Sequence, residues 1–470
     1  MKGNYNTMLK YLATSLGSHS ILPLFLVAAL YLPGAAVVAA APSGTVLVPA
    51  DDERINYYGR FDTTNPKKPR FNWSGAIIEA SFPGPVIGMQ MQHADAFYDI
   101  EIDGKLDTMI SCGNQSDFIF TSNLSTGVHT VRIMLRSEQH WGAGTFSGLY
   151  IGSEKELAPP PAMPSRIIEF IGDSHTAGYG IESDNRSCGN LLSRYTNANK
   201  TFAALIPRAF HARSTILAWS GAGMVRNYGE GTKRSESPYP VYYDKTLGAM
   251  SDSPIWDFTK DIPELVVINL GTNDYSTQPI PDDSMYIGDY HKLIARVLGH
   301  YPEASILCIS SGDATLERNV KKVVTEEQTS LGHPKVYFAP YPSGLSFNAC
   351  DWHPNIDDNV KMAAAFVDTI MKNLGWDTTA TIVQPLARTS GRNRSAALLS
   401  LSTTGNMVHI TARQSVQPGT AVQLTDLSGR VIAAQRLADD RTCRFTLNRV
   451  QPGIYFAGNS RYGWIKTPVR

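Results

Sequence analysis

The feature that most constrains the fold is an alternation of short apolar runs and helical patterns between residues 166 and 376. Short apolar runs bounded by turn residues are typical of strands buried on both faces. They lie at residues 167–171, 215–219, 265–270, 306–309 and 336–339. The helical patterns between them are clearest in the last one, where apolar residues recur at three- and four-residue spacing before Gly375 ends the pattern, namely Val360, Ala364, Val367, Met371 and Leu374. This alternation predicts an α/β domain with a parallel sheet covered by helices on both sides.

Both flanks of this domain have a β pattern. In residues 45–156 apolar and polar residues alternate, as in Tyr98–Asp103, and short strands separated by Gly, Asn and Asp turns predict a β-sandwich. Residues 157–165 contain four prolines and form a stiff linker. A polar linker at 377–399 leads to a predicted small all-β domain at 400–470.

The first 41 residues are typical of a secretory signal peptide. Two lysines precede the apolar stretch 21–38, and three alanines follow it. The alternative is an uncleaved anchor helix, against which Pro23, Pro33 and Gly34 argue. No later segment reaches the roughly 18 apolar residues of a membrane span. We therefore expect an exported protein without a stable membrane span.

Charge and cysteine content exclude several partners and sites. Lys plus Arg and Asp plus Glu both number 42, so the net charge is zero, which argues against nucleic acid as a partner. No CxxC occurs among the five cysteines, and we expect no metal or organic cofactor. In an oxidising compartment Cys188 and Cys350 are the pair to test for a disulfide, because the predicted fold could bring both near the site. The odd number of cysteines leaves at least one thiol unpaired or intermolecular.

Three loops at the ends of predicted buried strands carry residues suited to acyl transfer. There is no P-loop, GxGxxG, HExxH, EF-hand loop or GxSxG elbow. Instead, Ser174 follows the first strand in GDSHT, Gly221 follows the second in SGAG, and Asn273 follows the third in GTND. The Ser174 and Gly221 N–H groups and the Asn273 amide could stabilise an oxyanion. Taken singly, Gly-Asp-Ser is also ordinary turn and helix-cap chemistry.

A serine nucleophile requires a base, and His353 is the candidate. It lies in DWHP, after the last strand and before the last helix, and therefore at the same edge of the sheet as Ser174. His175 is adjacent to Ser174 in sequence, which is a poor geometry for a base. The sequence therefore predicts a Ser174–His353 pair, with Asp173 holding the turn in shape rather than reacting.

As a set, these four blocks resemble the SGNH (GDSL-like) hydrolase superfamily. The segments GRF, FNWSGAIIEASFPG and Tyr98–Asp103 are similar to the N-terminal jelly-roll of carbohydrate esterase family two, which precedes an SGNH domain. The resemblance spans roughly residues 45–375. It implies a three-layer SGNH domain and removal of acetyl groups from polysaccharides such as xylan or mannan.

The resemblance also implies roles for the two residues before His353. Superfamily members usually carry Asp three residues before the histidine, but that position is Cys350 here, and Asp351 is two before. Asp351 is therefore the expected orienting acid, and the alternative is a Ser-His dyad assisted by a backbone carbonyl. Trp352 is expected to stack on a sugar face; its alternative is a packed hinge aromatic.

The last segment is similar to the C-terminal sorting domain of the type IX secretion system. The similarity rests on VQLTDLSGRVIAAQ, LNRVQPGIYF and GWIKTPVR. It implies passage across the outer membrane by the type IX machinery, with the tail removed or used for surface attachment. An ordinary carbohydrate-binding or spacer domain is the alternative.

These expectations combine into a secreted carbohydrate O-acetyl esterase that acts on an acetylated polysaccharide. Two alternatives remain open. The same residues could hydrolyse acyl esters of peptidoglycan or lipid, or the chain could be a non-catalytic carbohydrate-binding surface protein.

Overall fold

The structure is a computed structural model that describes residues 41–140, 142–378, 399–404, 407–412, 421–425, 431–436, 438, 442–446, 453–459 and 463–469. The predicted signal peptide, apart from its last residue, lies outside the described residues, as does nearly all of the predicted linker 377–399. The proposed domain boundaries therefore stay predictions.

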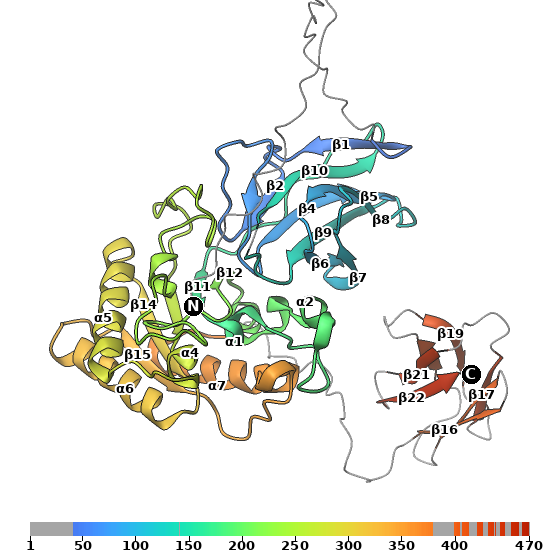
Figure 1. The fold of residues 1–470 in the computed structure, drawn as a ribbon. Coiled ribbons are helices and arrows are strands. Elements are labelled where there is room, and N and C mark those ends of the chain that lie inside the picture. Colours follow the sequence, from blue (N-terminus) through green and yellow to red (C-terminus); the bar gives the residue numbers. More distant parts are fainter. Residues whose placement is uncertain are drawn as a thin grey trace, which may run out of the picture. The chain divides into compact units, whose positions relative to one another are not determined.

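The N-terminal part is built from two antiparallel five-stranded sheets (Figure 1). The first sheet has the order β1-β10-β5-β8, with β3 paired to β10; these strands span Thr45–Pro49, Gly144–Gly152, Ile87–Gln92, Asp117–Thr121 and Arg70–Phe71. The second has the order β2-β4-β9-β6-β7, spanning Ile55–Tyr58, Ile77–Pro83, Val128–Leu135, Phe97–Ile102 and Lys105–Ser111. Apolar side chains from both sheets form one core. The expected N-terminal β structure is confirmed.

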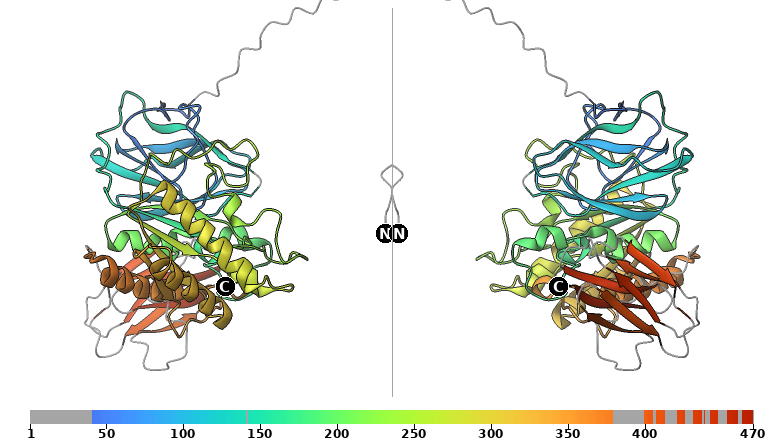
Figure 2. Two further views of the ribbon diagram at one scale, coloured as in Figure 1. Left: turned by 90° about the vertical axis from the view of Figure 1, so that its left-hand side faces the viewer. Right: turned by 90° about the vertical axis from the view of Figure 1, so that its right-hand side faces the viewer.

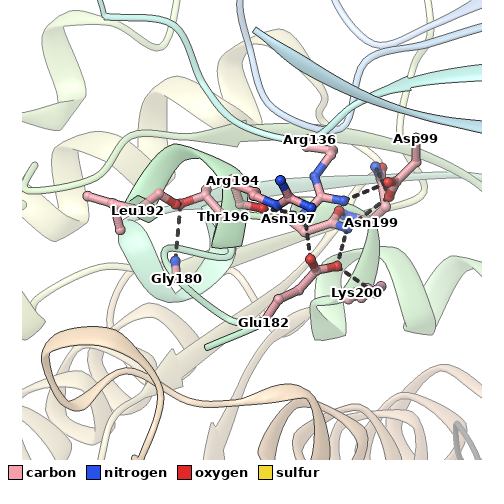
Figure 3. A network of polar contacts seen from close by, with 10 residues as sticks. All are labelled: Asp99, Arg136, Gly180, Glu182, Leu192, Arg194, Thr196, Asn197, Asn199 and Lys200. Atoms are coloured by element: carbon pink, nitrogen blue, oxygen red, sulfur yellow. Dashed lines mark hydrogen bonds and ion pairs between the residues drawn. The ribbon is translucent and has the colours of Figure 1, made fainter. Parts of the chain in front are cut away.

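The outer face of the second sheet is covered by the α/β segment, which explains a departure from simple alternation. In β6, Tyr98, Ile100 and Ile102 point into the sandwich core, whereas Asp99 points to the opposite face and yet is only 3% exposed. Its Oδ1 accepts a hydrogen bond of 2.8 Å from Arg136, which also donates to Glu182 of the α/β segment at 2.6 Å (Figure 3). The second sheet is thus apolar on one face and salt-bridged on the other.

The middle of the chain forms a five-stranded, all-parallel sheet. Its order is β12-β11-β13-β14-β15, with strands at Arg213–Ala218, Ile167–Gly172, Leu265–Asn269, Ser305–Ser310 and Val336–Pro340. Every one of the five predicted apolar runs is a strand. Most of their side chains are buried, because helices cover both faces of the sheet.

The helices divide between the two faces of this sheet. Helices α5 (Asp283–His300) and α6 (Ala314–Thr329) pack on one face, toward the viewer in the left-hand view of Figure 2. Helices α3 (Phe202–Ala209) and α7 (Ile356–Leu374) pack on the other. A capping box of Asn355 and Asp358 starts α7, and Gly375 in a left-handed conformation ends it. The sequence predicted the end at Gly375. The expected α/β fold is confirmed.

The strand order creates a natural position for a site. Strand β11 pairs with β12 on one side and β13 on the other. The next strand in the chain, β12, lies on one side of β11, and the one after it, β13, lies on the other. The strand order therefore reverses at β11, and open α/β sheets hold their ligands at the carboxyl end of such a strand. The short helices α1 (Ser174–Ala177) and α4 (Thr272–Ser276) begin directly after β11 and β13.

Seven strands are described in the C-terminal segment. Strands β16 (Leu399–Thr404), β17 (Met407–Ala412) and β20 (Thr442–Thr446) form one antiparallel sheet. The second sheet consists of β19 (Val431–Arg436), β18 (Ala421–Thr425), β21 (Gly453–Asn459) and β22 (Gly463–Val469). An independent C-terminal domain stays a prediction. No helix within the described residues is long and apolar enough to cross a membrane.

Candidate active site

Ser174 occupies the first position of α1, immediately after β11. Asp173 caps this short helix through a 3.0 Å hydrogen bond that its Oδ1 accepts from the His175 N–H. Asp173 is fully buried, and burial raises the pKa of its carboxyl to about 7. Asp173 thus shapes the turn that presents the Ser174 hydroxyl, as predicted from the sequence.

His353 meets Ser174 across the edge of the sheet. The His353 Nε2 and Ser174 Oγ atoms lie 2.8 Å apart, although the residues are separated by 179 positions in the chain. Burial lowers the pKa of the His353 imidazole below 6.5, and hydrogen bonds to the backbone of Cys350 and Asp351 partly oppose this shift. His353 is therefore neutral at pH 7 and able to accept a proton from the hydroxyl.

Backbone carbonyls, and not a carboxylate, hold the other nitrogen of His353. Its Nδ1 lies 2.9 Å from the Cys350 carbonyl oxygen and 3.1 Å from that of Asp351. The Asp351 carboxylate instead accepts a 2.8 Å hydrogen bond from the Tyr179 hydroxyl. The contact to His353 Nδ1 is thus the one that the alternative, a backbone carbonyl, describes, and the role of Asp351 stays a prediction. The reason for the carbonyl contact is local: Asp351 and Trp352 have left-handed φ angles of 47° and 60°, which aim the carbonyls of this turn at the imidazole.

Two rings that the sequence did not single out for the site surround the imidazole of His353. The Tyr179 ring stacks on it with centroids 4.4 Å apart, and the His175 ring meets it edge-on at 5.1 Å. His175 is buried, and its Nδ1 lies 3.0 Å from the Tyr341 hydroxyl, so it packs behind the site rather than serving as base. Tyr179 follows GDSHT by one turn, but nothing in the sequence pattern indicated stacking.

A disulfide fixes the turn that carries His353. Cys188 and Cys350 are bonded with Cα atoms 5.5 Å apart, as the sequence suggested for this pair. Gly180 lies against the disulfide so closely that a Cβ there would overlap the Cys350 side chain. The disulfide thereby ties the carbonyl acceptor of His353 to the segment that carries Tyr179. The described free cysteines, Cys112 and Cys308, are buried.

The three predicted oxyanion donors lie on the expected loops. No hydrogen bond between described residues uses the Ser174 or Gly221 N–H. The Asn273 side chain is buried and donates one N–H to the Ala222 carbonyl at 2.9 Å, which leaves its second hydrogen for a ligand. Gly221 has a φ of 81°, a left-handed conformation that favours glycine.

Asp274, the residue after Asn273, anchors the loop of residues 220–226, which contains Gly221 and Gly223 and is called the glycine loop below. Its carboxylate accepts three backbone hydrogen bonds of 2.7–2.9 Å from Met224, Val225 and Arg226. Asp274 is part of the GTND motif, in which only Asn273 had a predicted role. Its place directly after a predicted strand end was the available signal.

An open cleft of about 630 Å³ lies beside the site. Its lining includes Tyr179 and Ser220, and also Glu138 and His140 of the sandwich, but neither Ser174 nor His353. Trp352 is 62% exposed, with the Arg186 guanidinium 5.3 Å from its ring centroid. The aromatic is therefore available on the surface rather than packed in a hinge.

Within the described part of the chain, no group of three or more His, Cys, Asp or Glu side chains could hold a metal ion.

Known proteins match both parts of this architecture. The family model for the carbohydrate esterase 2 N-terminal domain matches residues 57–161, and that of the GDSL-like lipase/acylhydrolase family matches residues 170–392. The cellulase/esterase CelE of Acetivibrio thermocellus is 33% identical over 69% of this chain, which spans only 40% of the length of that relative. An acetylxylan esterase/glucomannan deacetylase of Cellvibrio japonicus is 27% identical over 71% of this chain and 93% of its own.

A solved structure gives the decisive match. A family two carbohydrate esterase from Clostridium thermocellum, in complex with cellohexaose, superposes with a TM-score of 0.63 and 32% identity. The match covers 68% of this chain and 99% of that one. The chain is therefore an esterase that belongs to carbohydrate esterase family two.

Proposed function

We propose that the protein is a secreted polysaccharide O-acetyl esterase that uses Ser174 as nucleophile and His353 as general base. The observation that carries this proposal is the 2.8 Å contact between Ser174 Oγ and His353 Nε2 at the edge of the parallel sheet. A hydroxyl and a neutral imidazole in hydrogen-bond contact are the pair that acyl transfer requires.

In the proposed reaction, Ser174 Oγ attacks the acetyl carbonyl carbon while His353 Nε2 takes the hydroxyl proton. The negative charge on the carbonyl oxygen is stabilised by the Ser174 and Gly221 N–H groups and the Asn273 amide. His353 then protonates the departing sugar oxygen, which leaves an acetyl-Ser174 ester. A water molecule, deprotonated by His353, attacks this ester; His353 returns the proton to the departing Ser174 Oγ, and acetate is released.

The substrate class follows from the cleft and from the relatives. The open cleft of about 630 Å³ beside the site leaves room for a carbohydrate chain, and exposed Trp352 offers a flat face for a sugar ring. The Cellvibrio japonicus relative carries the name acetylxylan esterase/glucomannan deacetylase. Acetylated xylan or glucomannan is accordingly our proposed substrate.

Export is part of the proposal. The first 41 residues are proposed to be a cleaved signal peptide, and the C-terminal segment a sorting domain read by the type IX secretion machinery. A disulfide between Cys188 and Cys350 fits an oxidising destination.

The function is tested by measuring acetate release from acetylated xylan, acetylated glucomannan and O-acetylated peptidoglycan. We expect release from the two plant polysaccharides and its loss in Ser174→Ala. Ser330→Ala, at the exposed end of α6, is the matched control and should keep full activity. Unchanged release in Ser174→Ala would contradict the proposal and favour a non-catalytic binding protein. Preferred hydrolysis of peptidoglycan, or of long-chain over acetyl nitrophenyl esters, would favour the other substrates.

A further inference from the structure

The glycine loop of the site is held from the N-terminal side by the β-sandwich. Trp219, two residues before Gly221, contacts the His140 ring at a centroid distance of 4.4 Å and the Trp73 ring edge-on at 5.4 Å. The next residue, Ser220, donates its N–H to Glu138 Oε1 at 3.1 Å. Trp73, Glu138 and His140 of the sandwich therefore contact the two residues that precede Gly221, the proposed oxyanion donor.

Glu138 is a charged acceptor in a buried place. Its side chain is 5% exposed, and His140 Nε2 lies 3.5 Å from the same oxygen that accepts from Ser220. Burial alone would raise the pKa of the Glu138 carboxyl, but the interaction with His140 and the contact with Ser220 lower it. Glu138 is therefore ionised at neutral pH, and the contact with Ser220 depends on the reach that places its Oε1 atom within hydrogen-bond distance.

The loop needs an anchor at this point because Gly221 itself makes few contacts. No atom lies within 4 Å of where a Gly221 Cβ would stand, and its left-handed φ places it in a conformation that glycine enters and leaves freely. On the C-terminal side the loop is held by Asp274, through residues 224–226, and by Asn273 through Ala222. On the N-terminal side, the Ser220 N–H is held by Glu138.

We propose that Glu138 is a positioning residue for ester hydrolysis, whose carboxylate holds the Ser220 peptide and thereby aims the Gly221 N–H at the oxyanion. The N-terminal β-sandwich then completes the active site of the α/β domain instead of only adjoining it. This inference rests on the proposed role of Gly221 in the reaction.

The test compares two substitutions of Glu138, one that removes the charge of its side chain and one that shortens it. Glu138→Gln keeps an oxygen acceptor at the same distance but removes the charge. Glu138→Asp keeps the charge but is one methylene shorter and withdraws from the Ser220 N–H. We expect Glu138→Asp to lower kcat for 4-nitrophenyl acetate about 10- to 100-fold, approaching the loss of one oxyanion donor. KM should change less than threefold, and Glu138→Gln should stay within threefold of the original kcat.

Glu79→Ala is the control, because it removes a carboxylate of the same sandwich that contacts Tyr58 and Arg132. It should leave kcat unchanged even where it lowers the melting temperature. Equal kcat in Glu138→Asp and the unmodified, folded protein would overturn the inference, and so would equal impairment of Glu138→Asp and Glu138→Gln. A general structural role would lower the melting temperature of Glu138→Asp without the selective loss of kcat.

Because the Glu138 variants are measured on 4-nitrophenyl acetate and not on a polysaccharide, this test can fail or succeed independently of the test of the proposed function. If the unmodified protein hydrolyses 4-nitrophenyl acetate but no acetylated polysaccharide, the substrate proposal fails while the Glu138 comparison still stands. If Glu138→Asp keeps full kcat while Ser174→Ala is inactive, only the inference about Glu138 fails.

Discussion

The Nδ1 atom of His353 lies 2.9 Å from the main-chain carbonyl oxygen of Cys350. A carbonyl is neutral, so it fixes the tautomer and direction of the imidazole with less stabilisation of the imidazolium than a carboxylate would provide. Four predictions follow from this arrangement and from the buried groups around it, and a fifth from the interface between the sandwich and the α/β domain.

Replacing Asp351 by Asn should have a small effect. Its carboxylate contacts Tyr179 and not His353, and an Asn oxygen can still accept from the Tyr179 hydroxyl. We expect kcat to fall less than about tenfold, whereas loss of an orienting carboxylate costs about 10⁴-fold. Steady-state kinetics on 4-nitrophenyl acetate measures this, and a loss beyond a thousandfold would restore Asp351 as the orienting acid.

Removing the disulfide should lower both stability and kcat. Cys188→Ser opens a crosslink between residues 162 positions apart without altering the turn that contains Cys350. We expect a loss of about 2–5 kcal/mol in the free energy of unfolding. A fall in kcat should accompany it at temperatures where the variant is folded, because the Cys350 carbonyl is then less firmly placed. Denaturant unfolding and kinetics on the same sample check both, and Cys112→Ser, at a free buried thiol, is the control.

The pH dependence of kcat/KM should show an acid limb below pH 6.5. Burial lowers the pKa of His353, and only the neutral imidazole accepts the Ser174 proton. Activity therefore rises with pH through the lowered pKa, so that its midpoint lies below pH 6.5. Initial rates between pH 4.5 and 8 (about two units to either side of the imidazole pKa) measure the midpoint. A midpoint above 6.5 would show that the charged form is favoured.

Acid should destabilise the fold through buried neutral histidines. Burial lowers the pKa of His93 to about 3 and that of His175 well below 6.5. Below pH 6.5 the unfolded chain binds protons that these folded residues do not, so stability falls as pH falls. Each histidine contributes a slope of about 1.4 kcal/mol per pH unit. His93→Gln should reduce the slope between pH 6.5 and 5 by about that amount in denaturant titrations, and an unchanged slope would contradict the assignment.

Arg136 should be needed to hold the sandwich against the α/β domain (Figure 3). It is buried and joins Asp99 to Glu182. Burial alone would raise the pKa of the Glu182 carboxyl, but the charges of Lys200 and Arg136 lower it. Arg136→Ala leaves buried Asp99 and half-buried Glu182 each short of a partner, at a cost of about 3–5 kcal/mol in the free energy of unfolding. Lys233→Ala, at an exposed ion pair with Asp282, should cost less than about 1 kcal/mol. Similar losses in both variants would remove the special role of Arg136.

Much of the site could be predicted because the relevant residues follow strands of one parallel sheet. Ser174, Gly221 and Asn273 each follow a run of buried apolar residues, and His353 precedes the last helix. The carboxyl ends of parallel strands share one edge, so the pattern alone brings these residues together. The choice between Asp351 and a backbone carbonyl stayed open, because sequence spacing does not reveal that residues 351 and 352 adopt left-handed backbone angles.

Hydrophobic periodicity in the sequence determined the buried strands, the helices that cover them and the edge at which the chemistry lies, because these depend on which residues must leave water. Only the tertiary structure decided which atoms meet at that edge. The Tyr179 ring on the imidazole and the Glu138 carboxylate on Ser220 join segments far apart in the chain, and the carbonyl on His353 Nδ1 depends on the backbone angles of its own turn. Hydrogen bonds depend on distance and direction within a fraction of an ångström, and such placement arises only once the chain has packed.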